Sequence, residues 1–323
     1  MLQRPTAPLD CCHHPLVRDL AWVVLAPDLI ATRWQGRPTR EQLGLADDAR
    51  FRDFLLALEA NPEPLERRVG NTVNGRMGLY HERLWQFLLD TAPATQLLAH
   101  NLRVQSGKQT LGELDLLYRR REDPAHIHLE VAIKFYLGLP EGPGGDTHQA
   151  RWIGPGGADS LASKRHRLHH HQLRLTERPE TRQALFELLG SDAVGADRPL
   201  VIHPQLAMPG VLFYPWRFHL PAPLDACHTH LRGTWLFWRQ WRSYRDGLAA
   251  GTRGAWLTKP HWLALPRPER LLALRELEAR LAEHFRKPAS PTQLALWHAE
   301  RGWRRLFVVA DDWPRQIPLP PYT

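Results

Sequence analysis

The sequence lacks several features that would place it in a specialised class. Its 323 residues include only 3 cysteines, an odd number that cannot form a fully paired disulfide framework. No apolar run approaches the roughly 18–20 residues that cross a bilayer. Residues 1–15 also lack the basic segment and apolar stretch that mark a signal peptide. We therefore expect a cytoplasmic protein with no membrane span.

Two of the cysteines stand in the run Cys11-Cys12-His13-His14, whose residue types are those of a zinc site. Structural zinc sites usually separate their ligands by two or more residues, so that a loop can wrap the ion. Four adjacent residues converge poorly on one metal. The run is therefore interpreted as an exposed N-terminal segment.

Positive charge is in excess, since 42 lysines and arginines face 34 acidic residues and give a net charge of +8. Such an excess favours an anionic partner, either a nucleic acid or an acidic surface. Most of the cations are arginines, and a planar guanidinium donates two hydrogen bonds at once to a phosphate. With 43% hydrophobic residues the chain can bury a sizeable core, as one large domain or two ordinary ones.

Residue patterns divide the chain into three regions. They predict an N-terminal helical extension over residues 1–65, an α/β core over 66–220 and a C-terminal α+β region over 221–323. The clearest helix of the C-terminal region is expected at 269–285, where leucines recur on one stripe.

The central region shows the most regular alternation of elements. Apolar residues at helical spacing predict a helix over 78–91. Alternating or apolar segments then predict three consecutive strands, and later elements complete the core. The strands are expected at 100–105, 110–119 and 126–137, followed by a helix over 159–175 with Asp159 as N-cap, a helix over 180–190, and strands at 199–203 and 211–214.

Two carboxylates stand on neighbouring strands of this expected meander, Asp115 and Glu130. A hairpin would bring them side by side, with Cβ atoms roughly 4.5–5.5 Å apart. Carboxylates that close repel each other unless a cation lies between them. Mg²⁺ prefers oxygen ligands and keeps several waters, so one or two carboxylates suffice to hold it.

Alternation along a strand places Glu130 and Lys134 on one face of the third strand, and Glu113 beside Asp115 on the second. A lysine ammonium there would orient an attacking water and stabilise developing negative charge. The alternative is a solvated sheet face on which the lysine is paired to a carboxylate. The other residues of both segments are strongly apolar, which indicates central strands, and charges on a central strand need a reason.

The segments GELDLL (112–117) and LEVAIK (129–134) resemble the PD-(D/E)XK nuclease superfamily, especially its resolvase-like branch. That superfamily has an α-β-β-β-α-β core with a mixed central sheet flanked by helices, and the expected element order matches it. The resemblance implies that Asp115 and Glu130 bind Mg²⁺ or Mn²⁺. It also implies that Glu82, on the preceding helix, is an accessory acidic residue.

The same resemblance extends to the following helix and to a wider family. Several branches of the superfamily place a glutamine beside the site, and Gln172 matches that position. Beyond the core, the chain resembles the bacterial domain-of-unknown-function family 1853, most clearly over residues 70–220. The segments that carry this second resemblance are 76–82, 112–115, 130–137, 154–164 and 210–215.

One position departs from the superfamily pattern. The lysine normally stands two residues after the glutamate, where this chain has Ala132, and Lys134 lies two residues further on. At about 3.3 Å per residue, the Cα atoms of Glu130 and Lys134 would be about 13 Å apart. Either Lys134 reaches back, or Lys164 or Gln172 substitutes from the following helix, or the site is degenerate.

The expected helix over 159–175 contains a basic run at 164–171. Lys164, Arg165 and Arg167 are interpreted either as a phosphate-contacting face beside the site or as a solvated helix face. Of the 13 tryptophans, most are expected in the core. Trp152, in the loop before the helix, is the best candidate for stacking on a base.

These features predict a metal-dependent nuclease acting on DNA or RNA. Asp115 and Glu130 would hold the cation with help from Glu82 or Glu113, while Lys134 supports the attacking water and Gln172 positions water or phosphate. The competing hypothesis is a catalytically inactive nuclease fold that binds nucleic acid or a protein partner. The two differ at the lysine, because an ammonium that cannot approach the carboxylates favours the second.

Overall fold

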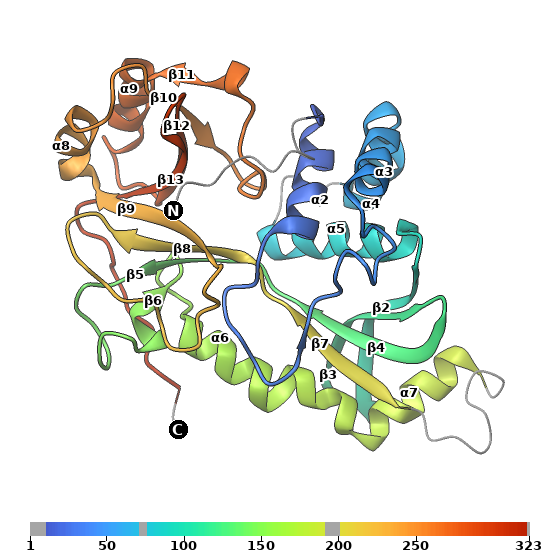
Figure 1. Ribbon diagram of the computed structural model, residues 1–323. Helices are drawn as coiled ribbons and strands as arrows, with labels where there is room; N and C mark the ends of the chain where they lie inside the picture. Colours follow the sequence, from blue (N-terminus) through green and yellow to red (C-terminus); the bar gives the residue numbers. More distant parts are fainter. Residues whose placement is uncertain (1–10, 71–75, 191–200, 322–323) are drawn as a thin grey trace.

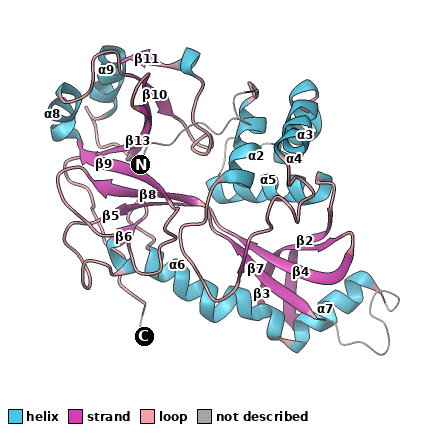
Figure 2. Ribbon diagram, in the orientation of Figure 1, coloured by secondary structure: helices cyan, strands magenta, loops and turns pink. Residues whose placement is uncertain are grey.

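The computed structural model describes residues 11–70, 76–190 and 201–321, which form two mixed β-sheets and eight α-helices (Figure 1, Figure 2). The mixed α/β class expected from the sequence is confirmed. In these three segments of the chain, no helix has the length and apolar character needed to cross a membrane. The two sheets adjoin, because two neighbouring strands of one sheet lead directly into two strands of the other.

The first sheet has the strand order β1-β7-β4-β3-β2. Strands β2, β3 and β4 form the antiparallel meander that the sequence predicted, while β7 joins β4 in parallel and β1 joins β7 in parallel. The bounds are β1 Gln35–Gly36, β2 Thr95–Ser106, β3 Gln109–Arg120, β4 Asp123–Val131 and β7 Ile202–Ala207. The strand expected at 199–203 thus lies slightly later, and residues 191–200 are outside the described residues.

The second sheet has the order β11-β10-β12-β13-β9-β8-β5-β6. Its central strands β13, β9, β8 and β5 are parallel, and the outer pairs are antiparallel. The bounds are β5 Lys134–Gly138, β6 Trp152–Ile153, β8 Gly210–Pro215, β9 Leu231–Phe237, β10 Arg253–Leu257, β11 Leu272–Ala273, β12 Thr292–His298 and β13 Gly302–Val309. The sheet therefore runs without interruption across residue 220, where the sequence had suggested a boundary.

The strand expected over 126–137 is in fact two strands that belong to different sheets. Strand β4 ends at Val131 beside β7, and β5 begins at Lys134 beside β8. The neighbouring strands β7 and β8 are separated at the same level. Pro209 lies between them and has no N–H to continue the hydrogen-bond ladder. Backbone groups at the break are satisfied by the segment before β1, since Met208 N donates to Asp28 Oδ1 (2.7 Å) and Leu29 N donates to Met208 O (2.9 Å).

Gly210 allows the chains to approach closely where the sheets meet. A Cβ atom at this position would lie 1.7 Å from the carbonyl oxygen of Lys134, which is backbone and cannot swing away. A glycine is therefore required for β5 and β8 to pair at this point.

Helices cover both faces of the first sheet (Figure 1). Helix α5 lies on one face together with α2, α3 and α4, in a hydrophobic cluster that includes Leu20, Phe51 and Trp85. The helical stretch from α6 to α7 lies on the other face, where Leu168 and Leu173 pack against Leu206. The bounds are α2 Pro15–Leu25, α3 Asp48–Ala60, α4 Glu63–Val69, α5 Met77–Thr91, α6 Leu161–Arg167 and α7 Pro179–Leu189.

The predicted helices over 78–91 and 180–190 are confirmed as α5 and α7. The helix expected from Asp159 begins one residue later, because Ser160 is the N-cap and accepts a hydrogen bond from Ser163 N (3.2 Å). Helices α8 (Trp241–Asp246) and α9 (Leu274–His284) pack on the second sheet through a separate cluster.

Candidate active site

The carboxylate pair lies at the point where β4 leaves the first sheet. Leu116 is the register partner of Leu129, which places Asp115 and Glu130 at the next step of the two strands. Val131 N donates a hydrogen bond to Asp115 Oδ2 (3.0 Å), so the Asp115 side chain reaches across to β4. The hairpin therefore brings the two carboxylates together, as the spacing predicted.

The two carboxylates differ in exposure. Glu130 is buried, with 1% of its surface accessible, whereas Asp115 is partly exposed. Burial raises the pKa of Asp115 to about 6, with the Val131 hydrogen bond opposing and the charge of Glu82 adding to the rise. Burial and the neighbouring Asp115 charge raise the pKa of Glu130 well above its usual range. Burial is the main cause of both shifts, because it disfavours the charged form of a carboxyl group.

Lys164 and Gln172 hold the buried carboxylate from the helical side. Gln172 Nε2 donates to Glu130 Oε1, and Lys164 Nζ donates to Gln172 Oε1 at 2.9 Å. Lys164 Nζ also lies 3.5 Å from Glu130 Oε1. Lys164 is itself buried, and burial lowers its pKa while the charge of Glu130 opposes that shift. Lys164 thus faces the site instead of forming an outer phosphate-contacting face with Arg165 and Arg167.

A π-helical turn aligns these two side chains. An α-helix advances about 100° per residue, so residues eight apart would point about 80° away from each other. Here the stretch Leu168–Gln172 is wound more widely, with Leu173 N donating to Leu168 O. The wider turn reduces the angular advance and brings Gln172 onto the same side as Lys164. Such turns occur frequently at functional sites.

Lys134 does not reach the carboxylates, which corrects the role expected for it. Because the chain passes into the second sheet after Val131, Lys134 is no longer on the strand of Glu130. Its Nζ instead lies 2.5 Å from Asp159 Oδ2. The alternative substitution from the following helix, by Lys164, is the arrangement that the structure contains.

The two accessory acids lie in different settings. Glu82 on α5 accepts a hydrogen bond from Gln86 Nε2 (2.8 Å), and its charge contributes to the raised pKa of Asp115, so it lies near the pair. Glu113 is exposed and is the register partner of Arg103 on β2. Of these two residues, the structure brings only Glu82 into electrostatic contact with Asp115.

The expected nucleic-acid contacts are distributed differently. Arg165 Nη1 lies 2.5 Å from Asp225 Oδ2, and Arg167 Nη2 lies 3.2 Å from Asp159 Oδ1, so an acid partly neutralises each. The expectation that Trp152 stacks on a base is wrong. Its side chain has no accessible surface and packs edge to face on Tyr214, with ring centroids 4.9 Å apart.

His128 was missed by the sequence reasoning. It shares a face of β4 with Glu130, and its Nε2 lies 3.9 Å from Glu130 Oε2. Both residues are buried, and among the described residues neither ring nitrogen of His128 nor Glu130 Oε2 has a hydrogen-bond partner. Burial lowers the pKa of His128 to about 4. The alternation His126-x-His128-x-Glu130 was the available signal, since residues two apart on a strand share a face.

The donor atoms can be compared with the needs of a divalent cation. Glu130 Oε2 is a buried carboxylate oxygen without a hydrogen bond, next to a second carboxylate of raised pKa. Two carboxylates suit Mg²⁺ or Mn²⁺, which fill their remaining positions with water. In the described part of the chain, no three His, Cys, Asp or Glu side chains are gathered as a metal site. The residues present therefore fit a cation held by two protein ligands and solvent.

The raised pKa of Asp115 predicts how stability changes with pH. Between pH 3.8 and about 6, the native state keeps a proton that the unfolded chain releases, so stability is lost as pH rises through this window. Asp115→Asn should remove this slope, and at pH 7 it should be more stable than wild type by no more than about 3 kcal/mol. Urea unfolding of both proteins from pH 4 to 7 measures it, and a difference that does not grow with pH would contradict the burial of this charge.

Comparison with known proteins identifies one family. Residues 18–309 match the family described as "Domain of unknown function (DUF1853)", a span that includes the carboxylates, Lys164 and every strand of both sheets. The comparisons with curated proteins and with solved structures gave no match.

Proposed function

The chain belongs to the DUF1853 family, and we propose that it is a metal-dependent nuclease that hydrolyses phosphodiester bonds of DNA or RNA. The observation that carries the proposal is the set of residues around Glu130. Asp115 lies on the neighbouring strand, and Lys164 and Gln172 contact Glu130 from the helical side. The elements that form and cover the first sheet support it, because α5, β2, β3, β4, α6 and β7 agree in order with the α-β-β-β-α-β core of PD-(D/E)XK nucleases. Strands β5 and β6 of the second sheet stand between β4 and α6, and α7 stands before β7. The net charge of +8 suits a polyanionic substrate.

Each residue of the site has a distinct task in this proposal. Asp115 and Glu130 would hold Mg²⁺ or Mn²⁺, which would supply an activated water and offset charge on the phosphate. Lys164 takes the place of the superfamily lysine in this proposal, and its ammonium would orient the attacking water and stabilise developing negative charge. Gln172 orients both Glu130 and Lys164 through its amide. Glu82 assists from α5 on the side of Asp115.

A second candidate function is supported by one observation. Lys164 already compensates Glu130, and no three-ligand metal group is gathered among the described residues. A site of this kind is also compatible with an inactive nuclease fold that binds nucleic acid or a protein. The two functions are distinguished by cleavage.

The test is cleavage of single- and double-stranded DNA and RNA with Mg²⁺ or Mn²⁺. Wild type is expected to cut at least one substrate, and EDTA is expected to stop it. Absence of cleavage on every substrate with both metals, together with retained binding, would leave the inactive-fold alternative standing.

The two lysines provide a matched pair of variants. Lys164→Met should lower the cleavage rate about a hundredfold, because removing one group that stabilises developing charge costs about 10²–10³ in rate. Lys134→Met should leave the rate within about twofold and cost less than about 1 kcal/mol, because its pair with Asp159 is partly exposed. Cleavage rates of both variants decide which lysine is catalytic. A larger loss of rate in Lys134→Met than in Lys164→Met would assign the catalytic role to Lys134.

A further inference from the structure

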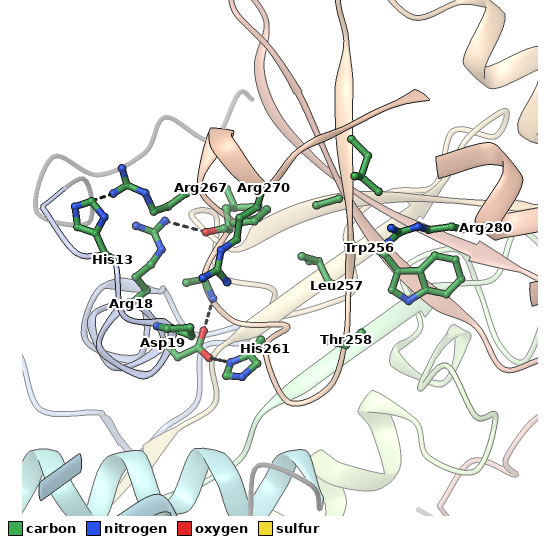
Figure 3. Close-up of a pocket in the computed structure, with 16 residues that line it drawn as sticks. His13, Arg18, Asp19, Trp256, Leu257, Thr258, His261, Arg267, Arg270 and Arg280 are labelled. Carbon is green, nitrogen blue, oxygen red and sulfur yellow. Dashed lines mark hydrogen bonds and ion pairs between the residues drawn. The ribbon is translucent and has the colours of Figure 1, made fainter. Parts of the chain in front are cut away.

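A second cluster of polar residues lines a pocket of about 380 Å³ between helix α2 and the C-terminal segments (Figure 3). This volume falls in the roughly 300–1,000 Å³ range of small-ligand sites. The lining residues come from two distant parts of the chain, residues 13–19 and residues 255–280. None of them belongs to the candidate active site.

The pocket is strongly basic. Four arginines line it, whereas Asp19 is the one acidic residue among the described lining residues; the arginines are Arg18, Arg267, Arg270 and Arg280. Arg267 is paired with Glu269 (3.1 Å). Arg270 and Arg280 are exposed, and within the described part of the chain neither forms an ion pair with an acid. An excess of cationic groups in the lining of a pocket favours the binding of an anion.

The carboxylate of Asp19 forms hydrogen bonds with groups inside the protein. Oδ1 accepts a hydrogen bond from Ala264 N (2.9 Å), and Oδ2 accepts one from the Tyr80 hydroxyl (2.6 Å). Its charge also acts on the fully buried guanidinium of Arg305, where it opposes the lowering of that pKa by burial. Asp19 is itself 1% exposed.

Asp19 also orients a histidine toward the pocket. His261 Nδ1 lies 2.8 Å from Asp19 Oδ2, so Nδ1 carries the proton and Nε2 is the nitrogen left to meet a ligand. His261 therefore contributes Nε2 as a polar atom of the pocket lining.

The lining groups are arranged along the length of the pocket in Figure 3. Arg18 lies toward one end, Arg270 and His261 lie in the middle, and Trp256 and Arg280 lie at the other end. Guanidinium groups recognise phosphate through paired hydrogen bonds, and a half-buried indole offers a flat apolar surface to a planar ring.

We propose that this pocket binds a phosphorylated ligand of nucleotide size. The phosphate groups contact Arg18 and Arg270, and the base lies against Trp256, where Arg280 donates a hydrogen bond to it. The proposal is independent of the nuclease assignment, because it uses no residue of the Asp115 site and requires no divalent cation.

The experiment is isothermal titration of the full chain with ADP and with inorganic pyrophosphate, in buffer containing EDTA. Both probes should bind saturably with one equivalent. Arg270→Ala and Arg280→Ala should each weaken ADP binding about tenfold, because hydrogen bonds to charged groups are the stronger class. Arg275→Ala is the matched control, an exposed arginine of α9 that does not line the pocket, and it should change nothing.

Further arms separate the parts of the proposal. Trp256→Leu should weaken ADP but leave pyrophosphate unchanged, and equal weakening of both would overturn the placement of the base. The absence of saturable ADP and pyrophosphate binding would overturn the site, as would equal effects of Arg270→Ala and Arg275→Ala. Binding of an oligonucleotide but not of ADP would overturn the small-ligand proposal in favour of a nucleic-acid surface.

Discussion

Asp115→Asn is expected to reduce Mg²⁺-dependent cleavage about a thousandfold, because a lost carboxylate ligand forfeits several kcal/mol of charge stabilisation. Asparagine is the informative replacement, since its side-chain oxygen can still accept the hydrogen bond from Val131 N. The local fold is then retained, and the change is confined to the charge. The variant should also be at least as stable as wild type at pH 7, because the raised pKa shows that the charge of Asp115 is disfavoured in the folded state.

The combination of lost activity and retained stability is what distinguishes a catalytic carboxylate from a structural one. Initial rates with Mg²⁺ and with Mn²⁺, together with urea unfolding, provide both readings. Glu113→Gln serves as the control, because Glu113 lies on the same strand but is exposed. Cleavage that survives in Asp115→Asn at the wild-type rate would remove Asp115 from the reaction.

Lys164→Met is expected to destabilise the fold by about 3 kcal/mol at pH 7, because it leaves Glu130 buried without its cation. The side chains of Lys164 and Glu130 are 10% and 1% exposed, so solvent cannot replace the lost partner. Uptake of a proton by Glu130 limits the loss, since the pKa of that carboxyl is already raised.

A second substitution tests the cause of that loss. The double variant Lys164→Met/Glu130→Gln should recover most of the stability, because both charges are then removed together. Lys134→Met is the comparison for a partly exposed pair. Urea unfolding of wild type and the three variants provides the free energies of unfolding. A double variant that remains as unstable as Lys164→Met would show that lost packing, and not the unpaired charge, causes the destabilisation.

The sequence was sufficient for features that depend on local spacing. The helix over 78–91 and the meander follow from periods that recur within a few residues. The juxtaposition of Asp115 and Glu130 follows from one short hairpin, whose register is fixed by Leu116 and Leu129. These expectations required no knowledge of distant parts of the chain.

Features that depend on distant pairing could not be predicted in the same way. Lys134 leaves the site because β4 and β5 take separate partners, β7 and β8, which come more than 70 residues later in the chain. The apolar run 126–137 contains no local signal for this break, which coincides with Pro209 on the partner. Alternation alone therefore assigned Lys134 to the wrong sheet.

The positions of the helical residues of the site could also be predicted only in part. In a regular α-helix, Lys164 and Gln172 would point in different directions. The π-helical turn that brings them to the same side cannot be predicted from the sequence. The contacts of Asp19 with Tyr80 and His261 were even less predictable from the sequence, because these residues lie 61 and 242 positions from Asp19. Contacts of that sequence separation arise only from the folded chain.

Binding of Mn²⁺ to the full chain, followed by electron paramagnetic resonance, tests the central claim most directly. Wild type is expected to bind one ion that is displaced by Mg²⁺, and Glu130→Gln is expected to lose that site while remaining folded. An unchanged Mn²⁺ affinity in Glu130→Gln, or no binding to wild type at millimolar metal, would contradict a cation site at Asp115 and Glu130.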